Sequence, residues 1–483
     1  MRQKAPSRRE VSWSRSAVAR AALWMFGLFV LTGPSLVAAA VPPAVKAHFS
    51  LSRQSLAQRA ASVPVGGAFR LVGVPVEART VALSLERFEV FTEDARIEVH
   101  GPRGTELAPL PRRTWFRGTV AEEPESLAFL SVGEDAVRGL ILSRERLFVL
   151  GTTPESPSFD ESLIVRAFDE TVAKTRSRPW KCALDELPGR VAGGHGFRSI
   201  LDESIDLVTA PATAQYSIKI SIDTDYELYS LFGSTGATAA YIGDLFGAIS
   251  TIYHRELSTT LRVNYISLWS GGAGSDPWTS ASAGDALDQV RIWWGSNRPQ
   301  SLYPRALTHF LSGKNLGGGV AYLGVLCNAS YGYGVTGNID GSFNPVTPSA
   351  VWDITATAHE IGHNFNSEHS HCYVPEVDRC YGSEPGCYAG SVSLPGGGKG
   401  SIMSYCHLVG GESAIALSLG TAGLYGTQSE RVPQLMKNHV AARTLSCRGV
   451  VDAPPADFNG DGRSEFFIYR NGAWMEFPFW PGR

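Results

Sequence analysis

Eleven residues in the second half of the chain restrict its possible folds more than any other feature. They read His359-Glu360-Ile361-Gly362-His363-Asn364-Phe365-Asn366-Ser367-Glu368-His369. Residues four apart lie on one face of a helix, so a helix here brings the imidazoles of His359 and His363 to one cation. Apolar residues at helical spacing support such a helix, namely Val351, Ile354, Ala358, Ile361 and Phe365. The segment therefore predicts a helix that packs on one side and holds a metal ion on the other.

A third ligand is expected, because catalytic zinc sites usually have three protein ligands and one open position. His369 lies six residues past His363, too far for the same helical face, so the chain must first turn away. Asn366 stands where this turn belongs, and Asn tolerates left-handed backbone better than most residues. We predict zinc ligands at His359, His363 and His369, with His371 as an alternative that lacks the matching spacing. Glu360 would then lie beside the metal-bound water as general base.

These residues resemble the metzincin zinc metallopeptidases, especially the reprolysin (ADAM-like) branch and its bacterial relatives. The family motif HExxHxxGxxH is followed by a methionine turn, and Ser401-Ile402-Met403-Ser404-Tyr405 is similar to that turn. Asn366 replaces the glycine of the family motif. Tyr405 is more like astacins and serralysins, in which this tyrosine contacts the metal or steadies the oxyanion. A packed aromatic ring with a hydrogen-bonded hydroxyl is the alternative for Tyr405.

Three further segments extend the resemblance. Gly319–Gly324 is similar to the edge strand along which the family binds an extended peptide, although a plain sheet strand fits these residues equally well. Phe116–Val120 and Leu127–Val132 are similar to the propeptide of ADAM-type proteins. The resemblance thus implies an α+β metzincin catalytic domain, with a mixed, mostly parallel sheet, preceded by a mostly β propeptide domain.

The order of apolar patterns agrees with this fold class. Short apolar runs separated by turn residues predict a mostly β region from Phe49 to Leu150, and Thr152 to Ala214 is typical of a connector. Strands and helices alternate beyond it, which favours an α+β domain. We place the propeptide at residues 41–210 and the catalytic domain at residues 211–449. The expected strands are Tyr216–Ile222, Leu261–Ile266, Arg305–Leu311 and Val320–Leu326, and the expected helices are Ala237–Leu257 and Ala281–Trp294.

The first forty residues have the pattern of an export signal. Basic residues precede an apolar core at Ala21–Leu31, and Ala38-Ala39-Ala40 offers a cleavage point. A retained membrane anchor is the alternative, although the apolar run is short and is broken by Gly33-Pro34. We therefore expect a signal peptide of residues 1–40 and a secreted or periplasmic protein with no stable membrane insertion. A net charge of only −3 gives no support to a nucleic-acid partner, and we expect a monomer that acts on proteins or peptides.

Seven cysteines in an exported chain predict disulfides and one remaining thiol. The expected pairing is Cys327–Cys447, Cys372–Cys406 and Cys380–Cys387, although four cysteines alone allow three connectivities. Cys182 lies before the catalytic region. In the resembling proenzymes a propeptide thiolate fills the open zinc position and keeps the enzyme latent. Cys182 is therefore a candidate zinc ligand of a latent form, with a spectator thiol as the alternative.

Residues 457–465 offer candidate oxygen ligands at alternate positions, a pattern that matches a calcium loop. The candidate ligands are Asp457, Asn459, Asp461, Arg463 and Glu465. The segment resembles a single FG-GAP (VCBS-type) repeat, followed by a strand at Phe466–Tyr469, while an Asp-Gly turn without an ion is the alternative. Because one repeat cannot form a propeller, residues 450–483 are expected to be an incomplete repeat.

Together these features predict a secreted zinc endopeptidase, made as a latent proenzyme, with Glu360 as general base and Tyr405 as a candidate catalytic residue. A thermolysin-like site, with a glutamate from a later helix as third ligand, is the closest alternative. A catalytically silent adhesion or binding protein with a metzincin fold is the second. Glu360 argues against the second alternative, because a silent protein has no need of that carboxylate.

Overall fold

The computed structural model describes residues 45–47, 53–152, 163–171, 180–184, 187, 215–421, 423–444, 446–450, 466–470 and 473–477. The expected signal peptide (1–40) and the expected calcium loop (457–465) lie outside the described residues. No helix within the described ranges is long and apolar enough to cross a membrane. A strand is present where one was expected near the C-terminus: β18 (Phe466–Arg470) pairs with β19 (Ala473–Phe477) as an antiparallel hairpin.

The first large sheet is antiparallel and is built from the N-terminal part of the chain, as the alternating apolar pattern predicts. Its strand order is β1-β10-β9-β8-β7-β6-β3-β2. One face buries a core of its own with helix α1 (Arg53–Ser62), centred on Leu83 and Phe116. The strands are β1 (Val45–Ala47), β2 (Ala68–Val76), β3 (Arg79–Phe88), β6 (Arg113–Val120), β7 (Glu123–Gly133), β8 (Val137–Ser143), β9 (Arg146–Gly151) and β10 (Leu163–Ala167), and the short helix α2 (Phe168–Thr171) follows β10.

The second sheet is mixed and mostly parallel, as expected for this fold class, and its strand order is β11-β15-β16-β14-β12-β13-β4-β5. β11 pairs with β15, and β12, β13, β14, β16 and β4 form the other parallel pairs. β15, β5 and β17 are antiparallel to their neighbours β16, β4 and β12. The strands are β4 (Phe91–Gly101), β5 (Gly104–Ala108), β11 (Lys181–Cys182), β12 (Tyr216–Thr224), β13 (Thr259–Trp269), β14 (Leu307–Leu311), β15 (Gly318–Ala321), β16 (Tyr333–Thr336) and β17 (Arg448–Val450).

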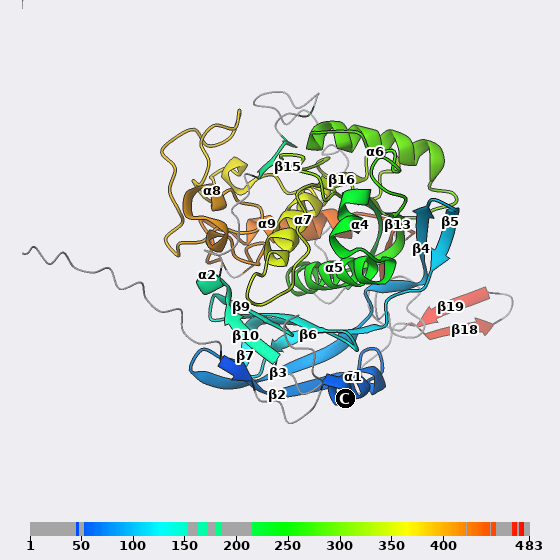
Figure 1. Cartoon of the computed structure of the whole chain (residues 1–483). Coiled ribbons are helices and arrows are strands. Elements are labelled where there is room, and N and C mark those ends of the chain that lie inside the picture. Colours follow the sequence, from blue (N-terminus) through cyan, green and yellow to red (C-terminus); the bar gives the residue numbers. More distant parts are fainter. Residues whose placement is uncertain are drawn as a thin grey trace, which may run out of the picture. The chain divides into compact units, whose positions relative to one another are not determined.

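Helix α5 (Thr235–Leu257) packs against both sheets (Figure 1). It is buried continuously from Thr238 to Tyr253. Ser234 starts the helix, because its hydroxyl accepts a hydrogen bond from the backbone N–H of Ala237. The approach to the first sheet is close, since an added Cβ at Gly247 would lie 2.8 Å from the Phe129 ring. The resulting apolar core includes strands β6 and β7 of the first sheet as well as β12 and β13 of the second.

The remaining helices follow the strands of the second sheet. Ser282 caps the expected helix in this region, α6, so it begins two residues later than its apolar pattern suggests. The helices are α4 (Tyr226–Phe232), α6 (Ala283–Asn297), α7 (Ala350–Asn364), α8 (His407–Gly410) and α9 (Arg431–Ala441), with the 3-10 turns η3 (Ser370–Cys372) and η4 (Glu412–Ala414).

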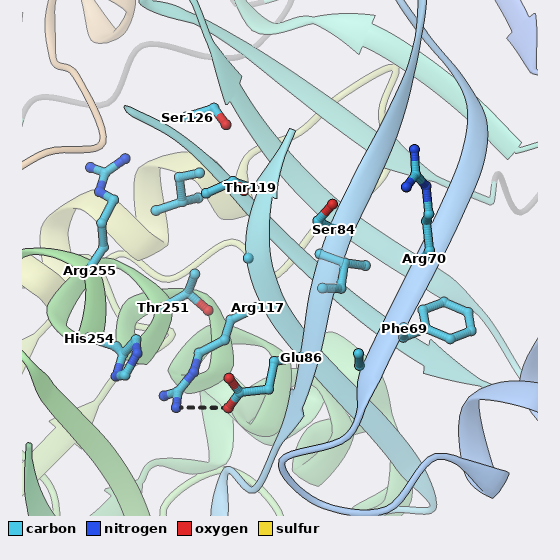
Figure 2. Close-up of a pocket in the computed structure, with 14 residues that line it drawn as sticks. Phe69, Arg70, Ser84, Glu86, Arg117, Thr119, Ser126, Thr251, His254 and Arg255 are labelled. Atoms are coloured by element: carbon cyan, nitrogen blue, oxygen red, sulfur yellow. Dashed lines mark hydrogen bonds and ion pairs between the residues drawn. The ribbon is translucent and has the colours of Figure 1, made fainter. Parts of the chain in front are cut away.

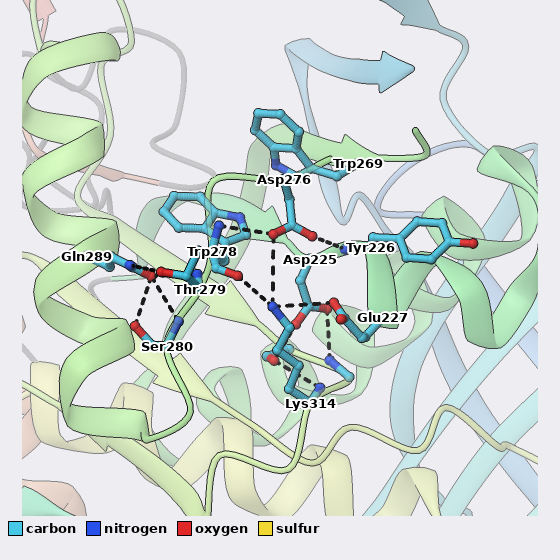
Figure 3. A network of polar contacts seen from close by, with 12 residues as sticks. Asp225, Tyr226, Glu227, Trp269, Asp276, Trp278, Thr279, Ser280, Gln289 and Lys314 are labelled. Atoms are coloured by element: carbon cyan, nitrogen blue, oxygen red, sulfur yellow. Dashed lines mark hydrogen bonds and ion pairs between the residues drawn. The ribbon is translucent and has the colours of Figure 1, made fainter. Parts of the chain in front are cut away.

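A polar network fixes the loops that follow β12, β13 and β14 (Figure 3). The Asp225 carboxylate accepts hydrogen bonds from the backbone N–H groups of Leu228 (2.8 Å) and Gly313 (3.0 Å). Asp276 accepts one from Tyr226 N–H (2.8 Å), and Lys314 Nζ donates to the Trp278 carbonyl (2.6 Å). These hydrogen bonds join the side chains to backbone groups of neighbouring segments, so the network holds these loops together.

A cavity of about 600 Å³ lies between the first sheet and the C-terminal part of α5 (Figure 2). Arg117, Glu86 and His254 are among its lining residues. None of the site residues expected from the sequence lines this cavity, so it is separate from the histidine cluster.

Three expectations about local structure are wrong. The strand expected at Val320–Leu326 ends at Ala321, because the N–H groups of Gly324 and Val325 instead bond the carbonyls of His363 and Asn364 at the end of α7. The expected connector contains β10, which continues the first sheet. The disulfides are Cys327–Cys447, as expected, but Cys372–Cys387 and Cys380–Cys406, because the chain path after His369 brings these pairs together.

Candidate metal centre

Helix α7 carries His359, Glu360 and His363, and every one of its residues is buried. It is fixed to α5 by two tyrosines: Tyr241 Oη donates to Asp353 Oδ2 (2.5 Å) and Tyr253 Oη donates to the Ala358 carbonyl (2.8 Å). Met403 packs directly beneath the histidine helix, since an added Cβ at Gly362 would clash with Met403 Sδ. The two helical histidines therefore stand on a rigid support.

The turn after the helix has the geometry that the sequence suggested. Asn366 adopts a left-handed conformation with φ 76°, and its N–H donates to the His363 carbonyl (2.9 Å). The chain then reverses, so that the rings of His363 and His369 lie 4.8 Å apart. Ser370 N–H donates to the Met403 carbonyl (2.9 Å), which ties this turn to the segment beneath α7.

Each of the three imidazoles is oriented through its Nδ1 atom. His359 Nδ1 lies 2.8 Å from the Ile402 carbonyl oxygen, and His363 Nδ1 lies 2.7 Å from that of Ser367. His369 Nδ1 lies 2.7 Å from Glu384 Oε2. Because Nδ1 is the donor in each pair, Nε2 is the nitrogen available to a metal, which is the usual arrangement around metal-binding histidines.

The distances fit a zinc ion. His359 Nε2 and His363 Nε2 are 3.1 Å apart, and Cys182 Sγ lies 3.4 Å from His363 Nε2. Zinc bond lengths in a tetrahedron place nitrogen ligands about 3.3 Å apart and sulfur about 3.6 Å from nitrogen. One ligand atom from each of Cys182, His359, His363 and His369 lies within 4.8 Å of the others, and all four residues are buried. Nitrogen and sulfur donors in this number are those that zinc prefers.

Burial shapes the protonation of the centre. Loss of solvent lowers the pKa of His359 well below its usual range, so its imidazole stays neutral, the form that binds metals. Burial also raises the pKa of Glu360 far above that of an ordinary carboxyl group, while the Cys182 thiol opposes this rise. Burial and the neighbouring Glu360 raise the pKa of the Cys182 thiol.

Glu360 lies between the histidines and the edge of the second sheet. Its Oε2 accepts from the Cys182 thiol at 3.5 Å, and an added Cβ at Gly319 would lie 2.5 Å from Oε1. Only a residue without a side chain leaves room for this carboxylate beside β15. Glu360 is thus next to the histidine cluster and next to the strand expected to bind a peptide.

Strand β11 covers that sheet edge. Lys181 and Cys182 pair in parallel with Gly318 and Gly319, and Ala183 N–H donates to the Gly319 carbonyl (2.9 Å). Tyr405 Oη donates to the Cys182 carbonyl (2.9 Å), so the tyrosine contacts the same segment as the histidine cluster. Its ring lies 4.5 Å from that of His369.

Trp180 closes the centre from the side of His359. Its ring meets the His359 ring edge-on at 5.3 Å, and its carbonyl lies 3.2 Å from His407 Nε2. The residue is only 3% exposed. Access to the histidines from this side therefore requires movement of the segment that contains Trp180 and Cys182.

The structure brings together His359, His363, His369, Glu360, Tyr405 and Cys182 from three separate parts of the sequence. Sequence reasoning missed Glu384, whose carboxylate contacts His369 and also His371 Nε2 (2.9 Å). The two histidines hold the pKa of Glu384 far below its usual range, against the effect of burial. No spacing rule marks Glu384, because its contact depends on the path of the disulfide-linked loop.

Comparison with known proteins agrees with this geometry. Residues 214–411, less than half of the chain, match the family model Reprolysin_5, described as metallo-peptidase family M12. This part of the chain is thus similar to metallopeptidases, whose chemistry the buried histidine cluster suits.

Two solved structures are also similar in part. A chain titled as metalloproteinase-II from Bacteroides fragilis is 11% identical, with a TM-score of 0.39, and the match covers 76% of this chain and 97% of that one. A chain from the structure of a chaperone-substrate complex is 15% identical, with a TM-score of 0.29, over 48% of this chain and 36% of that one. Neither TM-score reaches the level at which two chains share a fold.

Proposed function

We propose that this chain is a secreted, zinc-dependent endopeptidase that is made as a latent proenzyme. The observation that carries the proposal is the convergence of three Nδ1-anchored imidazoles on one buried point beside Glu360. The metallopeptidase family match over residues 214–411 supports the same class. Three disulfides support an extracellular location, because such bonds persist in oxidising compartments.

The residues of the centre suit hydrolysis of a peptide bond. A zinc ion held by His359, His363 and His369 would lower the pKa of a water molecule and polarise the substrate carbonyl. Glu360 would take a proton from that water and deliver it to the leaving amine. Tyr405 already donates to a peptide carbonyl, that of Cys182, and would donate in the same way to the developing oxyanion.

The substrate would be an extended peptide lying along β15. The carbonyl groups of Gly317 and Gly319 accept hydrogen bonds from residues 181 and 183 in this structure. A peptide that replaced β11 would use the same backbone groups, as in other cases of strand addition to a sheet edge. The segment 180–184 would therefore occupy the place of the substrate strand beside β15, and the Cys182 thiol would serve as fourth zinc ligand in the latent form.

The proposal includes the domain boundaries of the chain and the subtype of the peptidase. We assign residues 41–210 to a propeptide and residues 211–449 to a catalytic domain of the reprolysin-like type. The calcium loop at 457–465 stays a prediction from the sequence.

The proposal is tested with the full chain, purified with its metal content measured and assayed on casein before and after limited proteolysis. We expect one zinc ion per chain and casein hydrolysis that rises on proteolysis, disappears with a chelator and returns with added zinc. Glu360→Gln should keep the zinc and lose about 10²- to 10⁴-fold in activity, because the general base is gone.

The matched control is Glu376→Gln, which changes a partly exposed carboxylate that pairs with Arg379 outside the centre. It should hydrolyse casein like the unchanged chain. Full activity of Glu360→Gln would refute the assignment of the base. Zinc binding without hydrolysis in the unchanged, cleaved chain would favour the silent binding protein.

A further inference from the structure

The three histidines of the centre differ in what holds them. His359 and His363 stand on α7, and each Nδ1 donates to a backbone carbonyl that the fold itself fixes. His369 lies beyond the helix in extended backbone, with φ −61° and ψ 145°. Its ring orientation depends on a side chain, since its Nδ1 partner is the Glu384 carboxylate. The third ligand is therefore the one whose position depends most on another residue.

Glu384 is itself held in place from two sides. Its side chain is 1% exposed, and His371 Nε2 donates to the same Oε2 atom that accepts from His369. The rings of His369 and His371 are stacked, with an interplanar angle of 8° and centroids 5.3 Å apart. The disulfide Cys372–Cys387 closes the loop that carries Glu384. A buried carboxylate is costly unless it is paired, and here two imidazole donors pair it.

This arrangement is a support and not a second metal site. His369, His371, Cys372 and Glu384 do lie close enough to hold an ion, but the sulfur of Cys372 is in a disulfide and cannot act as a thiolate ligand. His371 is also absent from the cluster of close ligand atoms formed by Cys182, His359, His363 and His369, so it does not replace His369 among the candidate zinc ligands. Glu384 also falls outside the cluster formed by Cys182, His359, His363 and His369, where a thermolysin-like glutamate ligand would have to lie.

We propose that Glu384, held by His371, is the positioning residue that fixes the ring orientation and tautomer of His369 and thereby sets the affinity of the centre for zinc. This rests on the proposed function only in that the same three histidines bind the metal. A carboxylate behind a metal-binding histidine increases the basicity of the ring and prevents its rotation. The role is exerted through His369, so Glu384 needs no contact with substrate.

The test is a zinc dissociation constant, measured by competition with a chromophoric chelator on the full chain. Glu384→Gln, similar in size but uncharged, should bind zinc about 10- to 100-fold more weakly, the usual cost of removing such a partner. Glu376→Gln, in the same disulfide-linked region but away from the histidines, should bind zinc like the unchanged chain. His371→Asn should give a smaller loss, because Glu384 keeps its contact with His369.

Two further measurements separate positioning from a general structural role. The melting temperature of the zinc-free protein should be similar for Glu384→Gln and Glu376→Gln, and X-ray absorption at saturating zinc should still count three imidazoles in Glu384→Gln. If Glu384→Gln fails to fold, Glu384→Asp takes its place, with the charge kept, the reach shortened and an intermediate affinity expected.

Zinc affinity of Glu384→Gln within about twofold of the unchanged chain would overturn the positioning role. A change in the number of imidazoles would overturn it as well, because Glu384 would then act on the ligand set itself. The proposed function fails separately, if the unchanged chain binds no zinc.

Discussion

The part of the chain before residue 185 contacts the metallopeptidase-like part, residues 214–411, in two places that differ in size and chemistry. The first contact lies between the antiparallel sheet and α5, and it includes the pairing of β4 with β13. The second is the short segment 180–184, which covers β15 and the histidines. The first is a large apolar core with a buried charge network, and the second is a two-residue strand with a thiol.

Asp244 shows how the first contact is built. This residue of α5 is fully buried and accepts hydrogen bonds from Arg113 Nε (3.0 Å), Trp115 Nε1 (2.9 Å) and Arg138 Nη1 (2.6 Å), all from the first sheet. The two guanidinium groups lower the pKa of Asp244 despite its burial. Because this buried network joins α5 to β6 and β8, the first sheet is part of the folded core that surrounds α5.

The second contact buries little by comparison. Its apolar side chains Trp180, Cys182 and Leu184 join a small cluster near Tyr405. We therefore propose that stability resides mainly in the first contact and that, if the proposed function holds, the second contact controls access to the histidine cluster. Three measurements test this difference between the two contacts.

The largest effect is expected for Asp244→Asn, which removes the carboxylate charge from two arginines. Arg113 has a side chain only 1% exposed, so its charge would be left without its buried partner. We expect the free energy of unfolding, measured by urea with tryptophan fluorescence, to fall by about 3 kcal/mol. Asp135→Asn is the matched control, because Asp135 also pairs with Arg113 but is 61% exposed, and it should cost less than about 1 kcal/mol. Equal losses in the two variants would show that the buried Asp244 contributes no more to stability than the exposed Asp135.

Local parts of this picture could be predicted from the sequence. The spacing of His359, His363 and His369 and the left-handed turn at Asn366 depend on a few neighbouring residues. Apolar patterns of strand type located β12 and β13, and apolar patterns of helix type located α5 and α6. The strand pattern at 320–326 failed beyond Ala321, because the end of α7 takes the backbone donors of the following residues.

Distant contacts could not be predicted. The pairing of β4 with β13 joins residues far apart in the sequence, and no periodicity encodes such a choice. The exchange of partners among Cys372, Cys380, Cys387 and Cys406 has the same origin, since all three connectivities suit the spacing equally. The role of Glu384 could not be predicted, because a single acidic residue in a loop forms no sequence motif and its contact with His369 exists only in the folded loop.

A smaller effect is expected for Cys182→Ala, which tests the second contact. Removing the thiol should change the free energy of unfolding by no more than about 1 kcal/mol, since one small side chain is shortened. Casein hydrolysis without prior proteolysis should nevertheless rise about tenfold, equivalent to ~1.4 kcal/mol less competition for the centre. A loss of stability as large as that of Asp244→Asn, with no gain in activity, would show that the second contact stabilises the fold and does not control activity.

The smallest effect concerns pH and His254, on α5 beside the cavity in the first contact (Figure 2). Burial, assisted by the positive charge of Arg117, lowers the pKa of His254 to about 3. The unfolded chain takes up this proton near pH 6.5, so the contribution of His254 to stability is complete above pH 6.5 and is lost as the pH falls towards 3.

His254→Gln cannot be protonated, and its free energy of unfolding should fall less steeply between pH 7 and pH 4.5. Because His254 is partly exposed, the difference in slope should stay well below the ~1.4 kcal/mol per pH unit of one full proton. His309, buried in β14 with a pKa of about 3, keeps its own acid sensitivity in both proteins, so parallel curves would show that the first contact does not respond to His254.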